Sequence, residues 1–202
     1  KDFVKTTLVI VESPTKARTI ARFFGKPSKR EINGIEAFEI STGKKILSIV
    51  ASIGHLLDFS ENKGFDGVKI VKEKGKLMFL PVYDSIKRCK VCNEQFVDFN
   101  YCPRCKSKEF VDKRKIIEAL QNLALEVNEV LIATDPDAEG EKIAWDLALL
   151  LKPFNANIKR SEFHEVTRKA LKKAFEEARK IDEALVDAQI VRRIEDRWIG
   201  FE

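Results

Sequence analysis

The sequence predicts an α/β fold in which helices flank a mostly parallel β-sheet. Apolar, β-branched runs at residues 7–11 and 130–133 indicate buried strands, and each is followed by a segment with helical features. Strands that alternate with helices are typical of a parallel sheet. The chain has 202 residues, 44% of them hydrophobic, which is enough for a sizeable core.

The first helix is predicted from its capping residues. Ser13 is a good N-cap and Pro14 suits the first helical position, so residues 14–24 should be helical. Residues 36–40 and 45–51 flank a Thr-Gly pair and are expected to form a hairpin.

The middle of the chain has weaker patterns. Residues 52–88 are punctuated by glycines and are expected to form a long irregular excursion, with extended structure near 77–81. Residues 113–127 have the apolar spacing of an amphipathic helix. We also expect a helix over residues 141–151 and another strand within 157–163.

Two further helices are expected near the C-terminal end. Thr167 should cap one that runs to Lys180, and Asp182 should cap a last one that ends at about Trp198. Trp145 and Trp198 are most simply core residues.

An acidic cluster follows the predicted strand at residues 130–133. It has four carboxylates within seven residues, namely Asp135, Asp137, Glu139 and Glu141. Carboxylates at the carboxyl end of a strand in an α/β fold suit a hard divalent cation. The alternative is a solvated acidic turn whose glutamates favour the first turn of the next helix. Glu12 also follows a predicted strand, so it and the cluster could face one crevice.

The four cysteines form two CxxC pairs within 17 residues: Cys89, Cys92, Cys102 and Cys105. Two such pairs are typical of a structural zinc site, because each supplies two thiolates to a tetrahedral ion. The alternatives are disulfides, which the lack of a secretory signal disfavours, and a redox CxxC motif. The α/β pattern resumes afterwards, so we expect an inserted zinc ribbon at about residues 86–110. Its many lysines and arginines suit either phosphate contact or a solvated surface.

The charge balance fits a polyanionic partner without proving one. The chain carries 37 Lys and Arg against 32 Asp and Glu, a net charge of +5. It has no apolar run near the ~20 residues that span a bilayer, and no signal-like N-terminal segment. We therefore expect a cytoplasmic protein without a membrane partner.

Three separated segments together resemble type IA DNA topoisomerases. They are Glu-Ser-Pro-Thr-Lys-Ala from residue 12, Thr-Asp-Pro-Asp-Ala-Glu-Gly-Glu from residue 134, and Gln-Ile-Val-Arg-Arg-Ile-Glu-Asp-Arg-Trp-Ile-Gly from residue 189. The first two resemble the Toprim domain of that family, and the third resembles the start of the adjoining helical domain. The resemblance implies a Toprim domain over residues 1–166 and a helical segment over 167–202. A four-cysteine ribbon inserted in a Toprim domain is most similar to reverse gyrase, which introduces positive supercoils into DNA with ATP.

The resemblance implies a role for each matching residue. In type IA enzymes a tyrosine attacks a backbone phosphodiester of single-stranded DNA and keeps the 5′ phosphate. Glu12 matches the glutamate proposed as general acid and base at the leaving 3′ oxygen, and Lys16 matches the lysine that neutralises the scissile phosphate. The residues that match the Mg²⁺-binding carboxylates are Asp135, Asp137 and Glu139.

Residues of the last predicted helix are expected to complete the site. The resemblance implies a catalytic role for Arg192 and DNA contacts for Arg193, Arg197 and His55, with Asp196 orienting the arginines. Simpler interpretations stay open. Arg192 and Asp196 could form an ordinary helix-face ion pair worth ~0.3–0.5 kcal/mol. His55 could equally be a structural histidine.

The nucleophile that this chemistry requires has no match. Tyr83 and Tyr101 are the only tyrosines, and neither lies in the sequence context of the family's nucleophile. No Walker A pattern occurs, so ATP would act only through a helicase domain outside this chain. We therefore expect a fragment that is inactive alone. Its partners would be DNA, a tyrosine-bearing domain and the other topoisomerase and helicase domains of one protein.

Two alternative functions stay open. Another Toprim protein, such as a nuclease, a primase or a recombination mediator, would share the acidic cluster. Residues 12–16 and the arginine-rich last helix argue against it. A non-catalytic nucleic-acid-binding module would instead rely on the zinc ribbon and the basic faces.

Overall fold

The computed structural model describes residues 4–43, 45–181 and 183–200. The chain divides into two compact units, which we describe separately. Unit 1 comprises Lys1–Leu56 and Lys115–Ile181, and unit 2 comprises Leu57–Arg114 and Asp182–Glu202. Unit 2 is therefore built from a long insertion into unit 1 together with the C-terminal segment.

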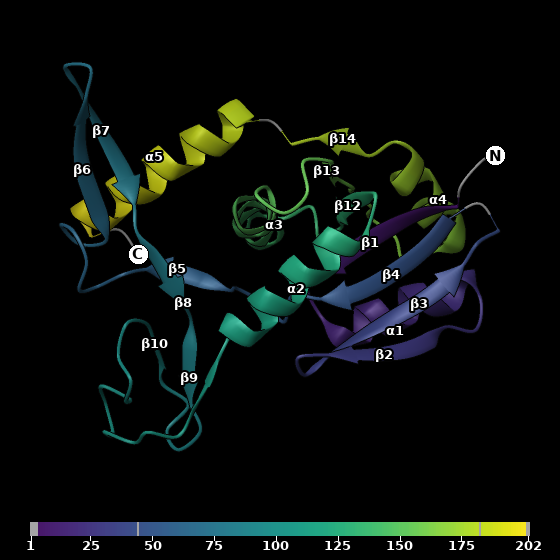
Figure 1. Cartoon of the computed structure of the whole chain (residues 1–202), viewed down its shortest axis with the longest axis horizontal. Coiled ribbons are helices and arrows are strands. Elements are labelled where there is room, and N and C mark those ends of the chain that lie inside the picture. The colour runs from purple at the N-terminus through teal and green to yellow at the C-terminus, as the bar shows by residue number, and fades with distance from the viewer. Residues whose placement is uncertain (1–3, 44, 182, 201–202) are drawn as a thin grey trace. The chain divides into compact units, whose positions relative to one another are not determined.

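A seven-stranded mixed sheet forms the centre of unit 1. Its strands are β1 (Lys5–Val11), β2 (Ser28–Ile32), β3 (Ile35–Ser41), β4 (Lys45–Ala51), β12 (Glu129–Ile132), β13 (Ile158–Arg160) and β14 (Arg179–Lys180). Their spatial order is β14-β13-β12-β1-β4-β3-β2 (Figure 1). The central strands β13, β12, β1 and β4 are parallel, while β14, β3 and β2 pair antiparallel towards the edges. The predicted α/β fold with a mostly parallel sheet is confirmed.

Helices pack on both faces of this sheet. They are α1 (Pro14–Phe24), α2 (Arg114–Glu126), α3 (Ala138–Leu151) and α4 (Arg168–Glu176). Val9 and Leu131 pack with Ile20 of α1 and Leu171 of α4 in one core cluster. Strand residues that alternate with these, such as Leu8, point to the other face of the sheet and are also fully buried. Helix α2 lies on that face, opposite α1 (Figure 1). No helix in the described part of the chain is long and apolar enough to cross a bilayer.

The ends of three helices test the predicted capping residues. Ser13 caps α1 by accepting a hydrogen bond from the Lys16 N–H, as predicted. Thr167 caps α4 as predicted, but this helix ends at Glu176 because residues 179–180 join the edge of the sheet instead. The predicted cap Asp182 lies outside the described residues.

The polar edge strand β2 and the start of helix α3 were not expected from the sequence. Strand β2 is polar and mostly exposed, so it lacks the apolar alternation that predicts a strand. Charged residues are common on edge strands, where they discourage pairing with other chains. Helix α3 begins at Ala138 rather than near residue 141, because Asp137 acts as its N-cap.

Unit 2 contains three small sheets and helix α5 (Glu183–Ile199). Its strands are β5 (Leu57–Phe59), β6 (Val68–Glu73), β7 (Lys76–Pro81), β8 (Tyr83–Ser85), β9 (Lys87–Cys89), β10 (Gln95–Phe96) and β11 (Phe110–Asp112). β5 pairs with β8, β6 pairs with β7, and β10-β9-β11 form the sheet of the cysteine insert. The expected irregular excursion over residues 52–88 is therefore wrong except for the extended structure near 77–81, which is β7. Lysines interrupt the apolar pattern of β6, so its strand signal is weak.

The two tryptophans differ in burial. Trp145 is buried in α3, as predicted. Trp198 is 38% exposed, so its predicted core position is wrong. Its ring instead makes edge contacts with Phe65 and Phe79, both of which are themselves partly exposed. Ile194, four residues before Trp198, is the buried residue of this part of α5.

Candidate functional site

The two strands that precede the candidate site residues are neighbours in the sheet. β1 and β12 are parallel, with Leu8 opposite Val130 and Ile10 opposite Ile132. Both strands therefore end at the same edge, where Glu12 and Asp135 follow them. The carboxyl edge of an open parallel sheet is where such folds bind ligands.

Lys16 joins these two carboxylates. Its Nζ lies 3.0 Å from Oε2 of Glu12 and 2.6 Å from both carboxylate oxygens of Asp135. The other oxygen of Glu12 accepts a hydrogen bond from the backbone N–H of Asp135. Glu12 lies just before the N-cap Ser13, and Lys16 lies in the first turn of α1, so the short connection from β1 to α1 brings the two side chains together. The structure thus brings together three of the predicted site residues.

Asp135 and Glu12 stabilise the positively charged form of Lys16. Burial disfavours its ammonium form, but the hydrogen bonds and charges of Asp135 and Glu12 outweigh burial and raise its pKa above the ordinary value. The side chains of Lys16 and Glu12 are 19% and 16% exposed, whereas that of Asp135 is 46% exposed. A fixed cation therefore lies beside an accessible carboxylate.

The other two carboxylates of the predicted magnesium set have different partners. Oδ1 of Asp137 accepts a hydrogen bond of 2.7 Å from the Gly140 N–H and so caps α3. Glu139 is 73% exposed, and its Oε1 lies 4.0 Å from Nε2 of His55. The backbone next to His55 is also tied to the site, because the N–H of Gly54 donates a hydrogen bond to the carbonyl of Glu12.

Gly140 lets the acidic loop lie against the first turn of α3. A Cβ at this position would overlap the backbone of Asp135, so a larger residue would displace the loop. Thr134 is fully buried, and its hydroxyl donates a hydrogen bond of 2.7 Å to the Gly140 carbonyl. The glycine within the acidic motif is therefore required by close backbone packing.

Arg160 is a site-supporting residue that the sequence analysis missed. Its side chain is 2% exposed, and it donates hydrogen bonds to several groups around the acidic loop. Its acceptors are the carbonyls of Ile132, Thr134, Asp135 and Ser161 and the carboxylate of Glu141. A buried guanidinium needs such a set of acceptors. The one sequence signal was an arginine in the predicted strand at residues 157–163.

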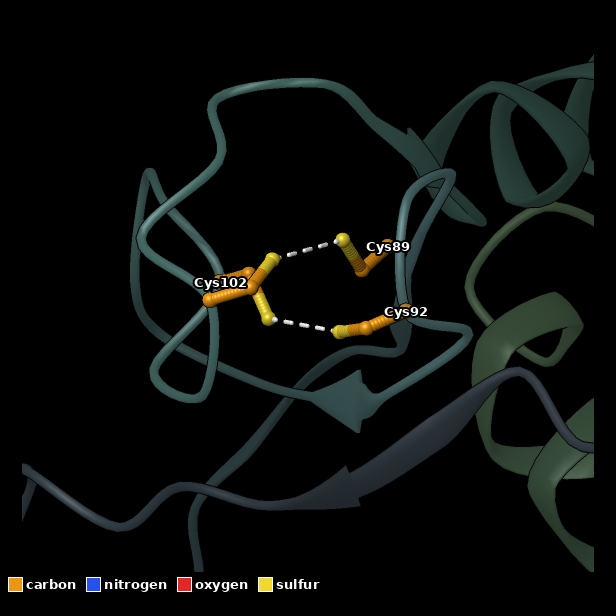
Figure 2. Close-up of side chains that lie close together, drawn as sticks. Cys89, Cys92 and Cys102 are labelled. Atoms are coloured by element: carbon orange, nitrogen blue, oxygen red, sulfur yellow. Dashed lines mark hydrogen bonds between the residues drawn. The ribbon is translucent and has the colours of Figure 1, made fainter.

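The four cysteines of unit 2 form a compact thiol cluster. All four Sγ atoms lie within 4.8 Å of one another, and this is the one such group of potential metal ligands among the described residues. The sulfurs of Cys92 and Cys102 are 3.5 Å apart, as are those of Cys89 and Cys105 (Figure 2). Tetrahedral Zn–S bonds of ~2.3 Å place sulfurs about 3.8 Å apart, so the cluster fits such an ion. None of the four is in a disulfide.

The cluster has its own small core and its own polar support. Phe96 packs edge-on against Phe110 beside the buried Cys89 and Cys102. The backbone N–H of Cys92 is the main cause that lowers the pKa of Cys89 to about 7. For Cys92, a backbone hydrogen bond from Glu94 lowers the pKa, but burial and the neighbouring thiols outweigh it and raise the pKa to about 12. The metal-free cluster therefore favours one thiolate, at Cys89.

The remaining predicted residues belong to unit 2. The Arg193 guanidinium lies 5.3 Å from the ring centroids of both Phe59 and Tyr83. Arg192 and Asp196 form the helix-face ion pair considered from the sequence, at 3.9 Å. Tyr101 packs beside Phe99 in the cysteine insert.

Comparison with known proteins identifies a family and several relatives. A family profile described as the Toprim domain matches residues 7–166. The chain is 58% identical to the reverse gyrase of Pyrococcus horikoshii over 205 residues, which is all of this chain and 13% of that protein. It is 56% identical to the reverse gyrase of Pyrococcus furiosus, covering 17% of it. It is 55% identical to reverse gyrase 2 of Aquifex aeolicus over 202 residues, again covering 17%.

The chain therefore spans less than a fifth of the length of each of these curated relatives. The profile match, by contrast, covers most of the chain and includes Glu12, Lys16 and the whole acidic cluster. On this match, the chain belongs to the Toprim domain family.

Proposed function

We propose that this chain is the Toprim region of a reverse gyrase and supplies the metal-binding and acid–base half of a type IA topoisomerase site. The observation that carries the proposal is the contact of Lys16 with both Glu12 and Asp135. It links the ends of two parallel strands through the residue types that phosphoryl transfer needs. The identity to reverse gyrases over the full chain supports the same assignment.

Glu12 and Lys16 have complementary tasks in this proposal. Lys16 neutralises a non-bridging oxygen of the scissile phosphate, which its raised pKa favours because it stays charged. For cleavage Glu12 must first be protonated; it then gives this proton to the leaving 3′ oxygen, while the tyrosine hydroxyl loses its proton to solvent as its oxygen bonds to phosphorus. During religation Glu12 takes the proton back from the 3′ hydroxyl. Its hydrogen bonds with Lys16 and with the Asp135 N–H hold its carboxylate in one place.

Asp135, Asp137 and Glu139 would hold Mg²⁺. Magnesium takes one or two carboxylates together with waters and phosphate oxygens, so an open arrangement of carboxylates suits it. Asp137 uses Oδ1 in the helix cap, which leaves Oδ2 for an ion, and Glu139 extends into solvent. When bound, the ion would supply further charge neutralisation at the phosphate.

Other parts of the reaction would come from elsewhere. We propose that the tyrosine nucleophile lies on another domain of the same protein, so that this chain alone does not cleave DNA. Arg192, Arg193, Arg197 and His55 would contact the single-stranded DNA, and ATP would act through a helicase domain. The segment 167–202 would begin the adjoining topoisomerase domain. The cysteine cluster would bind Zn²⁺ in a structural role, and the protein would act on DNA in the cytoplasm.

Substitutions in the full-length protein test the catalytic part. Glu12→Gln should lower DNA cleavage about 10²- to 10⁴-fold, because it removes the proton donor. Asp137→Asn should raise the Mg²⁺ concentration needed for cleavage. Glu31→Gln, at an exposed position of β2, is the matched control and should leave both unchanged. Undiminished cleavage by the Glu12 variant would refute the proposed site.

A further inference from the structure

A strongly basic hollow lies on unit 1, between α1 and the edge strands β2 and β3. Its volume is about 340 Å³, and its lining is Arg18, Arg22, Lys26, Pro27, Lys29 and Phe38. We call it the basic hollow. Lys16 and Glu12 are absent from its lining, so it is distinct from the site described above.

The local geometry explains why four cationic side chains converge here. Arg18 and Arg22 are one turn apart on α1, and Lys29 on β2 pairs directly with Phe38 on β3. The Arg18 guanidinium and the Lys29 ammonium lie 6.0 and 5.7 Å from the Phe38 ring centroid. Phe38 lies at the bottom of the hollow, and it is only 1% exposed because these side chains cover its ring.

Nearby acids balance the positive charge of the hollow only in part. Glu36 pairs with Lys29 at 3.0 Å and with Arg18 at 3.6 Å. Arg22 and Lys26 form no ion pair with any residue in the part of the chain that the structure describes. Glu31 shares this face of β2 but does not line the hollow. Like charges in such proximity repel unless an anion lies between them.

The opposite face of the same strand shows a different arrangement. Arg30 donates two hydrogen bonds of 2.8 Å to Glu126 and also contacts Glu39 at 3.4 Å. A cation on one side of β2 is therefore neutralised within the protein. The cations on the other side keep an excess positive charge that faces solvent.

We propose that the basic hollow binds the phosphodiester backbone of duplex DNA, as a contact separate from the cleavage site. This inference rests on the proposed function, because a topoisomerase meets duplex DNA on either side of the strand it cuts. Only the charged ends of Arg18, Arg22, Lys26 and Lys29 reach the ligand, which suits sequence-independent phosphate contact. Proteins that hold single strands add exposed aromatic rings for base stacking, whereas the ring of Phe38 is covered.

Binding of a short duplex to the 202-residue chain tests this inference. The variant is Arg22→Glu with Lys26→Glu, and the control is Lys115→Glu with Lys169→Glu, which makes the same charge change at exposed positions outside the hollow. We expect the first pair to weaken binding about tenfold or more. It should also lower the slope of log affinity against log salt by about 1.8, which is 0.9 for each lost phosphate contact. The control should change both by much less. Circular dichroism melting checks that all variants fold.

The same binding measurement, repeated with single-stranded DNA and with pyrophosphate as competitor, distinguishes duplex DNA from other ligands of the basic hollow. Equal losses in both pairs would overturn the inference, because they would reflect net charge alone. A larger loss for single-stranded DNA than for duplex, or displacement of duplex by low concentrations of pyrophosphate, would also overturn it in favour of another anion. All binding is measured without added Mg²⁺, so that no cleavage contributes to the signal. The result therefore stands or falls separately from the Glu12→Gln test of the catalytic proposal.

Discussion

Lys16 and Asp135 are 119 positions apart in the chain, yet Nζ of Lys16 lies 2.6 Å from both carboxylate oxygens of Asp135. The contact crosses from the first turn of α1 to the loop after β12. It also places a positive charge between Asp135 and Glu12, which would otherwise repel each other. The ammonium group of Lys16 therefore offsets the repulsion between these two carboxylates.

Replacing this lysine should destabilise the fold in a pH-dependent way. Lys16→Met should lower the free energy of unfolding at neutral pH by about 1–2 kcal/mol, because two carboxylates lose their counter-ion. The folded-state pKa of Lys16 is raised, so its contribution is fully present below its ordinary pKa of 10.5 and is lost as pH rises through the higher folded value. Urea unfolding at neutral and at strongly alkaline pH measures this. Lys142→Met, at an exposed position of α3, is the control, and equal effects of the two would contradict the prediction.

Loss of the buried guanidinium should have a larger effect. Arg160→Met leaves the carbonyls of Ile132, Thr134 and Asp135 without a donor, so we expect a loss of about 3 kcal/mol or more. Chemical denaturation measures the stability, and hydrogen exchange of residues 133–137 reports on the loop. Arg179→Met removes an exposed arginine that pairs with Glu162 at 2.6 Å, and should cost less than about 1 kcal/mol. A small loss of unfolding free energy in the Arg160 variant would show that the loop at residues 133–137 is stable without these hydrogen bonds.

Acid unfolding should depend on Glu129, at the start of β12. Burial raises the pKa of this carboxyl, but hydrogen bonds from Lys45, Thr7 and Lys159 outweigh it and lower the pKa to about 2. The resulting stability, up to about 3 kcal/mol, is present above the ordinary pKa of 4.5 and is lost as pH falls through about 2. Glu129→Gln should therefore be less stable than the unaltered chain at neutral pH.

Unfolding free energies measured across acid pH would show this difference shrinking. Glu126→Gln serves as the control, since Glu126 pairs with Arg30 on the surface and should contribute less than about 1 kcal/mol. A difference at Glu129 that stays constant down to pH 2 would indicate a cause other than its ionisation.

The cysteine cluster should carry one zinc ion per chain. Cys102→Ser should abolish zinc retention, because Cys102 is fully buried and faces Cys92 across the cluster. Metal analysis measures the stoichiometry, and hydrogen exchange should show loss of protection in β9 and β11 but not in α3. Val91→Ser, at an exposed position between Cys89 and Cys92, should retain the ion. Zinc binding by the Cys102 variant with unchanged protection would exclude a four-thiolate site.

The sequence predicted best where local chemistry decides the structure. The N-cap Ser13 and the following proline were enough to place α1, because capping involves residues only a few positions apart. The spacing of the cysteines likewise predicted a four-sulfur cluster, which the structure contains. Strands β2 and β6 escaped prediction, because exposed strands carry little apolar periodicity.

By itself, the sequence determined the alternation of the main strands and helices of unit 1, the family of the domain and the residue types at the candidate site. Only the tertiary structure decided which of those residues meet. It brought Lys16 to Asp135, buried Arg160 beneath the acidic loop and used Asp137 as a helix cap. It also gathered the cations of the basic hollow from a helix and a strand. The physical reason is that side-chain contacts between distant segments depend on strand order and register, which local patterns do not encode.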